Sequence, residues 1–187
     1  LYSFIVYHNL KYGLEIGTGF GVSTLTLGTA LIKNNGKLVT IDSYSEEMTK
    51  KYITDEAHKE AYYDSLGYKS TKFLIEKFGL NGCVFPYVGW SPEDLPWALK
   101  PLEGNKLDVV FVDGMHDDQS VINDIEGIKP FLADKFAIFF HEVHCFSEKV
   151  PAYLERTFSK SFSIIPICSM KLGWGYNLAI LDNLNVN

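Results

Sequence analysis

LEIGTGFGVST, residues 14–24, joins a short apolar run to the start of a predicted helix. Its alternating glycines let the backbone turn sharply and approach a ligand closely, and the helix that follows offers free N–H groups and the positive end of its dipole. The spacing is GxGxG rather than GxGxxG, which argues against a nicotinamide cofactor. The carboxylate of Glu15 favours a cationic ligand over a pyrophosphate. A purely structural turn between strand and helix is the alternative interpretation.

Short apolar runs alternate with longer helical stretches along most of the chain. Their length and their content of β-branched or aromatic residues favour strands over buried helix. Strands are expected at residues 14–16, 38–41, 84–88, 107–112 and 136–140. Helices are expected between them, at residues 23–33, 45–78, 92–99 and 119–132. This alternation predicts an α/β fold of the Rossmann-like, doubly wound type, with a mostly parallel sheet and helices on both faces.

The carboxyl-terminal part of the chain follows a different pattern. Two further strand-like runs, residues 163–167 and 176–181, flank a loop that contains two glycines. Strands joined by such a loop pair antiparallel, so we expect the last strand of a seven-stranded sheet to run against the others. The charge-rich segment 45–80 is the least regular part of the chain and is predicted to form a helical lid or cap.

The composition is that of one folded domain spanning residues 1–187. A hydrophobic content of 47% with 14% aromatic residues is too high for a disordered chain. The net charge of −6 disfavours a nucleic-acid partner, which needs a cationic surface. Three cysteines without close spacing fit a reducing, cytoplasmic compartment better than a disulfide framework. No apolar run has the length of a membrane span.

Asp42 ends the second predicted strand, beyond the glycine-rich loop in sequence. An acid at this place in a doubly wound fold binds the hydroxyl groups of a ribose. The alternative is an exposed Asp that caps the helix expected to begin near Ser45. The glycine-rich loop upstream favours the ribose role.

Four segments occur in a fixed order: EIGTGFGVST (15–24), VTID (39–42), VGWSPEDL (88–95) and DVVFVDGMH (108–116). Together they resemble the class I S-adenosylmethionine-dependent methyltransferases, and most closely the small-molecule O-methyltransferases of the catechol and macrocin O-methyltransferase type. The resemblance extends from Tyr12 to Asp182. It implies a seven-stranded sheet with an antiparallel final strand, in agreement with the pattern of the chain.

The resemblance also implies roles for individual residues. The methionine part of S-adenosylmethionine would be held by the glycine-rich loop, through Glu15, Gly17, Thr18, Gly19, Gly21 and Ser23. Asp42 and Ser43 would lie at the ribose. The residues that border the adenine would be Gly89, Trp90 and Ser91. Asp113 would face the sulfonium group and the methyl acceptor.

Candidate catalytic residues follow two neighbouring predicted strands, at the edge where ligands bind in open α/β sheets. They are Asp113, His116, His141, Glu142 and His144. Because imidazole titrates near neutral pH, His116 is expected to act as the general base beside Asp113, with His144 as the second candidate. The remaining acids of this region are expected to be solvated or to cap the next helix: Asp117, Asp118 and Asp124.

A metal site is a further expectation at this edge. In the metal-dependent relatives, an Asp after the fourth strand and an Asp-Asn or similar pair after the fifth strand hold Mg²⁺. Asp113 matches the first Asp and Glu142 occupies the place of the second acid, although Val143 stands where the amide would be. His141–Glu142 also resembles a His-Asp pair that many of the relatives carry at this place, with a longer acid. Asp113, Glu142 and His141 are therefore candidate ligands for Mg²⁺ or another divalent cation. The alternative for His141 and His144 is hydrogen bonding to loop backbone.

The favoured function is methyl transfer from S-adenosylmethionine to a hydroxyl, less readily an amine, of a small molecule, with assistance from a divalent metal. One alternative is a non-catalytic module that keeps the fold and the nucleotide pocket. A nicotinamide-dependent oxidoreductase is less favoured, because the glycine spacing is wrong. The expected partner is a small-molecule acceptor, and neither nucleic acid nor a membrane is expected. The sequence is compatible with a homodimer.

Overall fold

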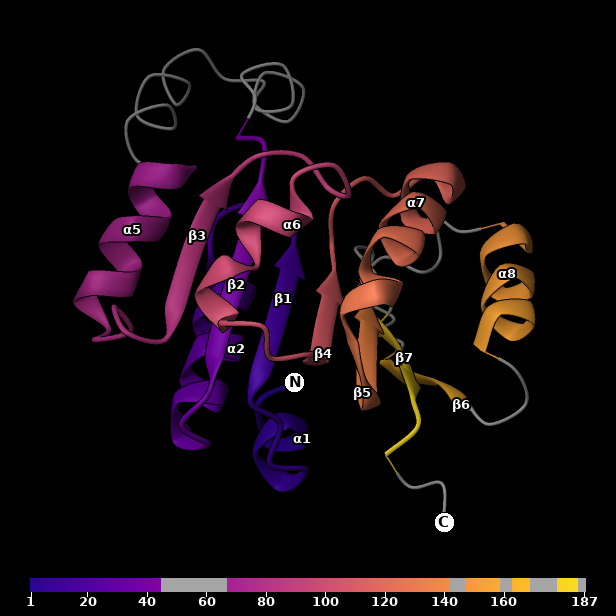
Figure 1. Ribbon diagram of the computed structural model, residues 1–187, viewed down its shortest axis with the longest axis horizontal. Coiled ribbons are helices and arrows are strands. Elements are labelled where there is room, and N and C mark those ends of the chain that lie inside the picture. Colours follow the sequence, from indigo (N-terminus) through magenta and orange to yellow (C-terminus); the bar gives the residue numbers. More distant parts are fainter. Residues whose placement is uncertain (45–66, 142–146, 159–162, 169–177, 185–187) are drawn as a thin grey trace.

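The computed structural model describes residues 1–44, 67–141, 147–158, 163–168 and 178–184. A central sheet lies between two layers of helices (Figure 1). The strands are β1 (Tyr12–Ile16), β2 (Lys37–Asp42), β3 (Val84–Val88), β4 (Leu107–Val112), β5 (Leu132–Phe140), β6 (Ser163–Cys168) and β7 (Leu178–Asp182). The helices are α1 (Tyr2–Tyr7), α2 (Val22–Lys33), α5 (Tyr68–Lys77), α6 (Leu95–Ala98), α7 (Asp118–Ile128) and α8 (Lys149–Phe158), with short 3₁₀ turns at Lys100–Leu102 and Lys129–Phe131.

The seven-stranded sheet has the order β3-β2-β1-β4-β5-β7-β6. β1 pairs in parallel with both β2 and β4, so the chain first builds outward through β3 and then returns to the other side of β1. The point between β1 and β4 where the strand order reverses is where open α/β sheets bind ligands, at the carboxyl ends of the strands. The predicted Rossmann-like α/β fold is confirmed.

The two faces of the sheet are covered by different helices. Alternate residues of β4 point to opposite faces: Val109 and Phe111 pack with the cluster that contains residues of α1, α2 and α5, whereas Val110 and Val112 pack with the residues of α6, α7 and α8. Strands buried on both faces need continuous apolar runs. This requirement explains why the sequence LDVVFV of β4 shows no polar alternation beyond its second residue.

The predicted antiparallel pairing of the last two strands is confirmed, and the structure also shows where the last strand lies in the sheet. β7 is antiparallel to both of its neighbours, with Phe140 of β5 opposite Ala179 and Ile165 of β6 opposite Ile180. The last strand therefore inserts between β5 and β6 instead of extending the sheet beyond β6. Hairpin pairing alone did not predict this insertion, because either edge of β6 could receive the strand.

Two helices and several boundaries differ from the prediction. The sequence analysis did not assign α1 or α8, although Val150, Tyr153 and Leu154 form a buried stripe on α8. The helix expected over residues 119–132 ends at Ile128, because Pro130 lacks the N–H that another helical turn would use. Of the lid predicted at residues 45–80, residues 45–66 lie outside the described part of the chain.

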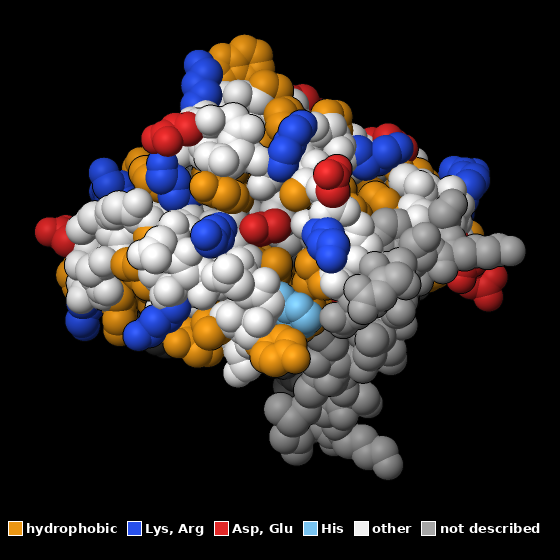
Figure 2. Space-filling view, turned by 60° about the horizontal axis from the view of Figure 1, so that its bottom comes forward, with side chains coloured by type: hydrophobic (Ala, Val, Ile, Leu, Met, Phe, Trp, Pro, Cys, Tyr) orange, Lys and Arg blue, Asp and Glu red, His pale blue; other side chains and the backbone are white. Residues whose placement is uncertain are grey.

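The face shown in Figure 2 is turned toward the amino-terminal ends of the parallel strands. Among the described residues on this face, basic and acidic side chains are interspersed with hydrophobic ones, and neither sign of charge forms a continuous patch. None of the described helices combines the length and the apolar character that a membrane crossing requires.

Candidate functional site

The predicted site residues that the structure describes gather at the carboxyl ends of β1, β2, β3, β4 and β5. Backbone hydrogen bonds carry the sheet pairing one residue past the strand ends. Gly17 N donates to Ile41 O at 2.9 Å, Asp113 N donates to Ile16 O at 2.8 Å, and His141 N donates to Val112 O at 3.0 Å. Backbone hydrogen bonds alone therefore fix the position of the first residue after each of these strands.

Gly17 is required where the loops after β1 and β4 approach each other. Its φ is +89°, and a Cβ at this position would lie 2.0 Å from the carbonyl oxygen of Asp113. Gly19 also has a positive φ, +51°, but a Cβ there would meet no atom within 4 Å. The first glycine therefore permits close backbone packing, and Gly19 borders open space. Both features are expected of a loop that lies against a ligand.

Asp42 clamps the glycine-rich loop to the end of β2. Its Oδ2 accepts hydrogen bonds from the backbone N–H groups of Thr18 at 2.9 Å and Gly19 at 3.0 Å, and its Oδ1 accepts one from Tyr44 N at 2.8 Å. Sequence analysis did not foresee this clamp. Hydrogen bonds to a carboxylate are among the stronger ones in proteins, so Asp42 also holds the shape of the loop. Its predicted contact with a ribose stays a prediction, as does that of Ser43.

Glu15 forms the centre of a buried polar network beneath the loop. Its Oε2 accepts hydrogen bonds from Thr24 Oγ1 at 2.5 Å and Thr40 Oγ1 at 2.6 Å, and Thr40 Oγ1 lies 2.6 Å from Thr18 Oγ1. Burial raises the pKa of Glu15 to about 7, although the nearby hydroxyls of Ser23, Thr24 and Thr40 act in the opposite direction. Oε1 is buried and makes no hydrogen bond of ordinary geometry with a described residue. The network thus retains one unused acceptor.

The segment after β3 is fixed to the same edge of the sheet. Gly89 N donates to Asp42 O at 3.0 Å, and Trp90 N donates to Asp94 Oδ2 at 2.9 Å. Trp90 is 56% exposed, so its ring is available for stacking. Ser91 Oγ is buried. The structure therefore places Gly89 beside Asp42, and the contact of Gly89, Trp90 and Ser91 with an adenine stays a prediction.

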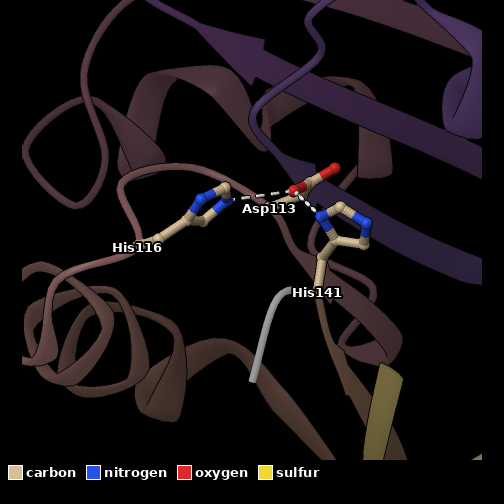
Figure 3. Close-up of side chains that lie close together, drawn as sticks. All are labelled: Asp113, His116 and His141. Carbon is tan, nitrogen blue, oxygen red and sulfur yellow. Dashed lines mark hydrogen bonds and ion pairs between the residues drawn. The ribbon is translucent and has the colours of Figure 1, made fainter. Parts of the chain in front are cut away.

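Asp113 lies between two histidines (Figure 3). It follows β4, on the other side of β1 from β2 and Asp42. Its Oδ1 is 2.6 Å from His141 Nδ1 and 3.3 Å from His116 Nε2. Burial by itself would raise the pKa of Asp113, but hydrogen bonds and the charges of His116 and His141 outweigh it and lower that pKa below its ordinary value. Asp113 is therefore held in its ionised form.

These three side chains offer ligand atoms that lie within 4.8 Å of one another. The predicted metal ligands Asp113 and His141 are thus adjacent, and His116, predicted as the base, joins them. Glu142 and His144, the other two candidates, lie outside the described residues. His141 could be predicted from the sequence because it directly follows β5, which is the neighbour of β4 in the sheet.

The three acids that follow Asp113 are a helix cap, an acid bonded to a neighbouring segment and a buried residue. Asp117 is the predicted cap: its Oδ1 accepts a hydrogen bond from Ser120 N at 3.0 Å at the start of α7. Asp118 is partly exposed and accepts hydrogen bonds from Ser147. The expectation for Asp124 was wrong, because it is only 4% exposed. Its place on the buried face of α7, three residues after Val121 and one before Ile125, was the signal that could have revealed it.

Comparison with known proteins agrees with this geometry. The sequence model of a family described as a methyltransferase domain matches residues 14–143. No curated protein sequence matches the chain significantly. Solved structures with the same fold include the O-methyltransferase from Bacillus cereus in complex with S-adenosylhomocysteine, with a TM-score of 0.64, 17% identity, and coverage of 96% of this chain and 77% of that chain.

Two further structures share the fold. The O-methyltransferase TomG of tomaymycin synthesis, from Streptomyces achromogenes and in complex with S-adenosylmethionine, has a TM-score of 0.69 and 17% identity over 97% of this chain and 77% of that chain. A TDP-rhamnose 3′-O-methyltransferase of calicheamicin biosynthesis has a TM-score of 0.62 and 14% identity over 96% of this chain and 76% of that chain. The family match covers well over half of the sequence, from β1 to the end of β5, and the chain therefore belongs to the methyltransferase domain family.

Proposed function

We propose that this protein transfers the methyl group of S-adenosylmethionine to a hydroxyl group of a small molecule. The observation that carries the proposal is the convergence of the glycine-rich loop, Asp42 and Asp113 at one edge of the sheet. This edge offers backbone for close approach, an acid for a ribose and an ionised acid beside histidines. The family match supports the same reaction.

The residues of the site fit S-adenosylmethionine. Oε1 of Glu15 is a buried acceptor that makes no hydrogen bond of ordinary geometry with a described residue, and an unsatisfied buried acceptor is costly. The α-ammonium of the methionine part would supply such a donor. The open space at Gly19 leaves room for the ligand against the loop backbone. Gly17, Thr18, Gly21 and Ser23 would complete the methionine side, and Asp42 with Ser43 the ribose side.

The sulfonium of bound S-adenosylmethionine supplies an activated methyl group. His116 would take the proton of the acceptor hydroxyl as the oxygen bonds to the methyl carbon and the carbon–sulfur bond breaks, with its electron pair left on sulfur. Asp113, at 3.3 Å from His116 Nε2, would stabilise the imidazolium that results. His141, at 2.6 Å from the same carboxylate oxygen, would fix the position of Asp113. Much of the catalysis is then alignment of oxygen, carbon and sulfur.

The acceptor class rests on the family and its relatives in fold. The three structural neighbours named above are O-methyltransferases, one of them in tomaymycin synthesis and one a TDP-rhamnose 3′-O-methyltransferase. A hydroxyl acceptor also fits the site, because an alcohol must lose its proton on methylation and His116 is placed to receive one. An amine acceptor is the less favoured alternative.

Assistance by a divalent cation is the second part of the proposal. Asp113 and His141 would be ligands, joined by the predicted ligand Glu142, while His116 acts as the base. An imidazole ligand favours a borderline transition metal over Mg²⁺, which prefers oxygen ligands. We expect exhaustive chelation to lower methyl transfer severalfold and Mn²⁺ or Zn²⁺ to restore it more fully than Mg²⁺. Full activity after chelation would contradict metal assistance without affecting the methyl-transfer proposal.

The proposal is tested by titration calorimetry with S-adenosylmethionine and S-adenosylhomocysteine, followed by a methyl-transfer screen over phenols, catechols and sugars. Binding of both nucleotides with turnover of a hydroxylated acceptor is the expected result. No binding at millimolar concentration would contradict it. Binding without turnover of any acceptor would favour the non-catalytic module instead.

A further inference from the structure

Two buried hydroxyl groups beneath the glycine-rich loop have no part in the proposed reaction. They belong to Tyr44, which follows Asp42 and Ser43, and to Thr71 on α5. Thr71 is only 1% exposed, and the hydroxyl oxygen of Tyr44 is also buried. Neither oxygen makes a hydrogen bond of ordinary geometry with a described residue. Buried polar groups are rarely left without a partner, so both hydroxyls call for an explanation.

The fold fixes both the backbone and the ring of Tyr44. Its φ of +47° lies in the left-handed region that a tyrosine rarely adopts. Its N–H donates to Asp42 Oδ1 at 2.8 Å. The ring packs edge-on against Tyr68 of α5, with 5.8 Å between the ring centroids, and a Cβ at Gly67 would lie 3.2 Å from Tyr44 Cδ1. The backbone of Tyr44 is thus held by Asp42, and its ring by the start of α5.

The hydroxyl of Tyr44 lies between α5 and the polar network around Glu15. Burial raises the pKa of Tyr44 to about 12, and the nearby hydroxyls of Thr18 and Thr71 act in the opposite direction. Thr18 belongs to the network of Glu15, through its contact with Thr40. A Cβ at Gly21 would lie 3.6 Å from Thr71 Oγ1, so Thr71 also borders the glycine-rich loop. Tyr44 therefore has one hydroxyl of the loop and one hydroxyl of α5 beside its own.

The donors of this network can be assigned one after another, because each hydroxyl has a single proton to donate. Thr40 donates its proton to Glu15 Oε2, at 2.6 Å. Thr18 Oγ1 lies 2.6 Å from Thr40 Oγ1 and must then be the donor of that pair. The oxygen of Thr18 is left as an acceptor, and the nearby hydroxyl of Tyr44 can donate to it. A Tyr44 hydroxyl that donates to Thr18 can in turn accept from Thr71.

We propose that Tyr44 and Thr71 are positioning residues, whose hydroxyls complete a chain of hydrogen bonds between α5 and the glycine-rich loop when the nucleotide binds. From donor to acceptor, the chain runs through Thr71, Tyr44, Thr18, Thr40 and Glu15. This inference rests on the proposed function, in which the loop and Glu15 hold the methionine part of S-adenosylmethionine. An α-ammonium beside Glu15 favours the charged carboxylate, which is the strongest acceptor of the chain, and each link then polarises the next.

Titration calorimetry with S-adenosylhomocysteine and thermal unfolding of the free protein test this proposal together. Tyr44→Phe and Thr71→Val each remove one hydroxyl and keep the shape of the side chain. Because neither hydroxyl makes a hydrogen bond of ordinary geometry in the fold, the unfolding temperature should not fall. The dissociation constant should rise about threefold to tenfold, the cost of a hydrogen bond that is lost from the complex alone. A merely structural hydroxyl would instead affect stability and leave the affinity unchanged.

Further variants test the order of the chain. If Thr71 acts through Tyr44, the double variant of Tyr44→Phe and Thr71→Val should match the affinity of Tyr44→Phe alone within about twofold. Thr71→Ser keeps the hydroxyl and loses a buried methyl group, so it should keep the wild-type affinity while its unfolding temperature falls. Tyr68→Phe removes a hydroxyl from the neighbouring ring and is the matched control, with the wild-type affinity expected.

Three results would overturn the inference. The first is an affinity of Tyr44→Phe within about twofold of the wild type. The second is a lower unfolding temperature of free Tyr44→Phe, which would mean that the hydroxyl is bonded before the nucleotide binds. The third is losses of affinity that add in the double variant. If Thr71→Val does not fold, Thr71→Ala takes its place in the affinity measurements. Failure of the wild type to bind S-adenosylhomocysteine would overturn the proposed function, whereas these three results overturn only the chain.

Discussion

The two halves of the site contain buried acids whose pKa values shift in opposite directions. On the β1–β2 side, Glu15 is surrounded by threonine hydroxyls, and burial raises its pKa to about 7. On the β4–β5 side, Asp113 is also partly buried, but His116 and His141 hold its pKa below the ordinary value. Neutral hydrogen-bond donors do not offset the loss of hydration at Glu15, whereas two imidazoles do so at Asp113.

The halves also differ in what holds them in shape. The glycine-rich loop is held largely by backbone groups: its N–H groups bind Asp42, and Gly17 packs against the backbone after β4. The cluster around Asp113 depends on side chains from two separate segments. Changes on the first side should therefore affect folding and nucleotide binding, and changes on the second side should affect turnover.

The largest effect is expected from Gly17→Ala. A Cβ at 2.0 Å from the carbonyl oxygen of Asp113 must displace backbone, so the free energy of unfolding should fall by more than about 3 kcal/mol. Binding of S-adenosylhomocysteine should be lost with it. Gly104→Ala is the matched control, because Gly104 has a similar φ of +81° and no atom within 4 Å of the added Cβ. Its cost should be about 1 to 2 kcal/mol. Equal costs in denaturant unfolding would contradict the close-packing argument.

His116→Gln should affect turnover without affecting binding. Removal of a general base costs roughly a hundredfold or more in kcat, while the affinity for S-adenosylhomocysteine should change less than about threefold. His8→Gln is the control for loss of an imidazole, since His8 stacks on Phe4 in the segment before β1. The measurement is steady-state kinetics together with calorimetry. A parallel loss of binding and kcat in His116→Gln would place His116 in the nucleotide pocket.

Glu15→Gln should reveal the raised pKa as a pH dependence of stability. Because the pKa is about 7 in the folded protein against an ordinary 4.5, the folded state keeps a proton that the unfolded chain releases between these values. The wild type should therefore lose about 2 to 3 kcal/mol of stability from this group as pH rises from 5 to 8. The variant should lack that loss. Urea unfolding at both pH values measures it, with the exposed Glu155→Gln as control; an identical pH dependence in Glu15→Gln and wild type would contradict the shift.

Much of the fold was predictable because it follows from local patterns. Apolar runs such as residues 107–112 must be buried on both faces, which predicts a parallel sheet between helices. The position of β7 between β5 and β6 depends on contacts between distant segments, which no local pattern records. The end of α7 at Ile128 was open to prediction from Pro130, whose missing N–H forbids another turn.

The candidate site, like the fold, could be predicted from the sequence only in part. Glu15, the glycines and Asp42 form a motif within a few dozen residues, so their meeting at one edge was predicted. The adjacency of Asp113 and His141 was also expected, because both follow parallel strands. Asp124 was misjudged, although its position between Val121 and Ile125 on the apolar stripe of α7 was a signal for burial. The packing of α7 against Pro92 and Gly114 shows that it is buried.

By itself, the sequence determined the fold class, the edge of the sheet at which ligands bind and the residues of the glycine-rich loop. These depend on strand periodicity and on glycine conformations, which are local properties. The tertiary structure decided the clamp of Asp42 on the loop, the histidines around Asp113 and the burial of Asp124. Ionisation and hydrogen bonding depend on which distant groups surround a side chain, and that is fixed only when the chain has folded.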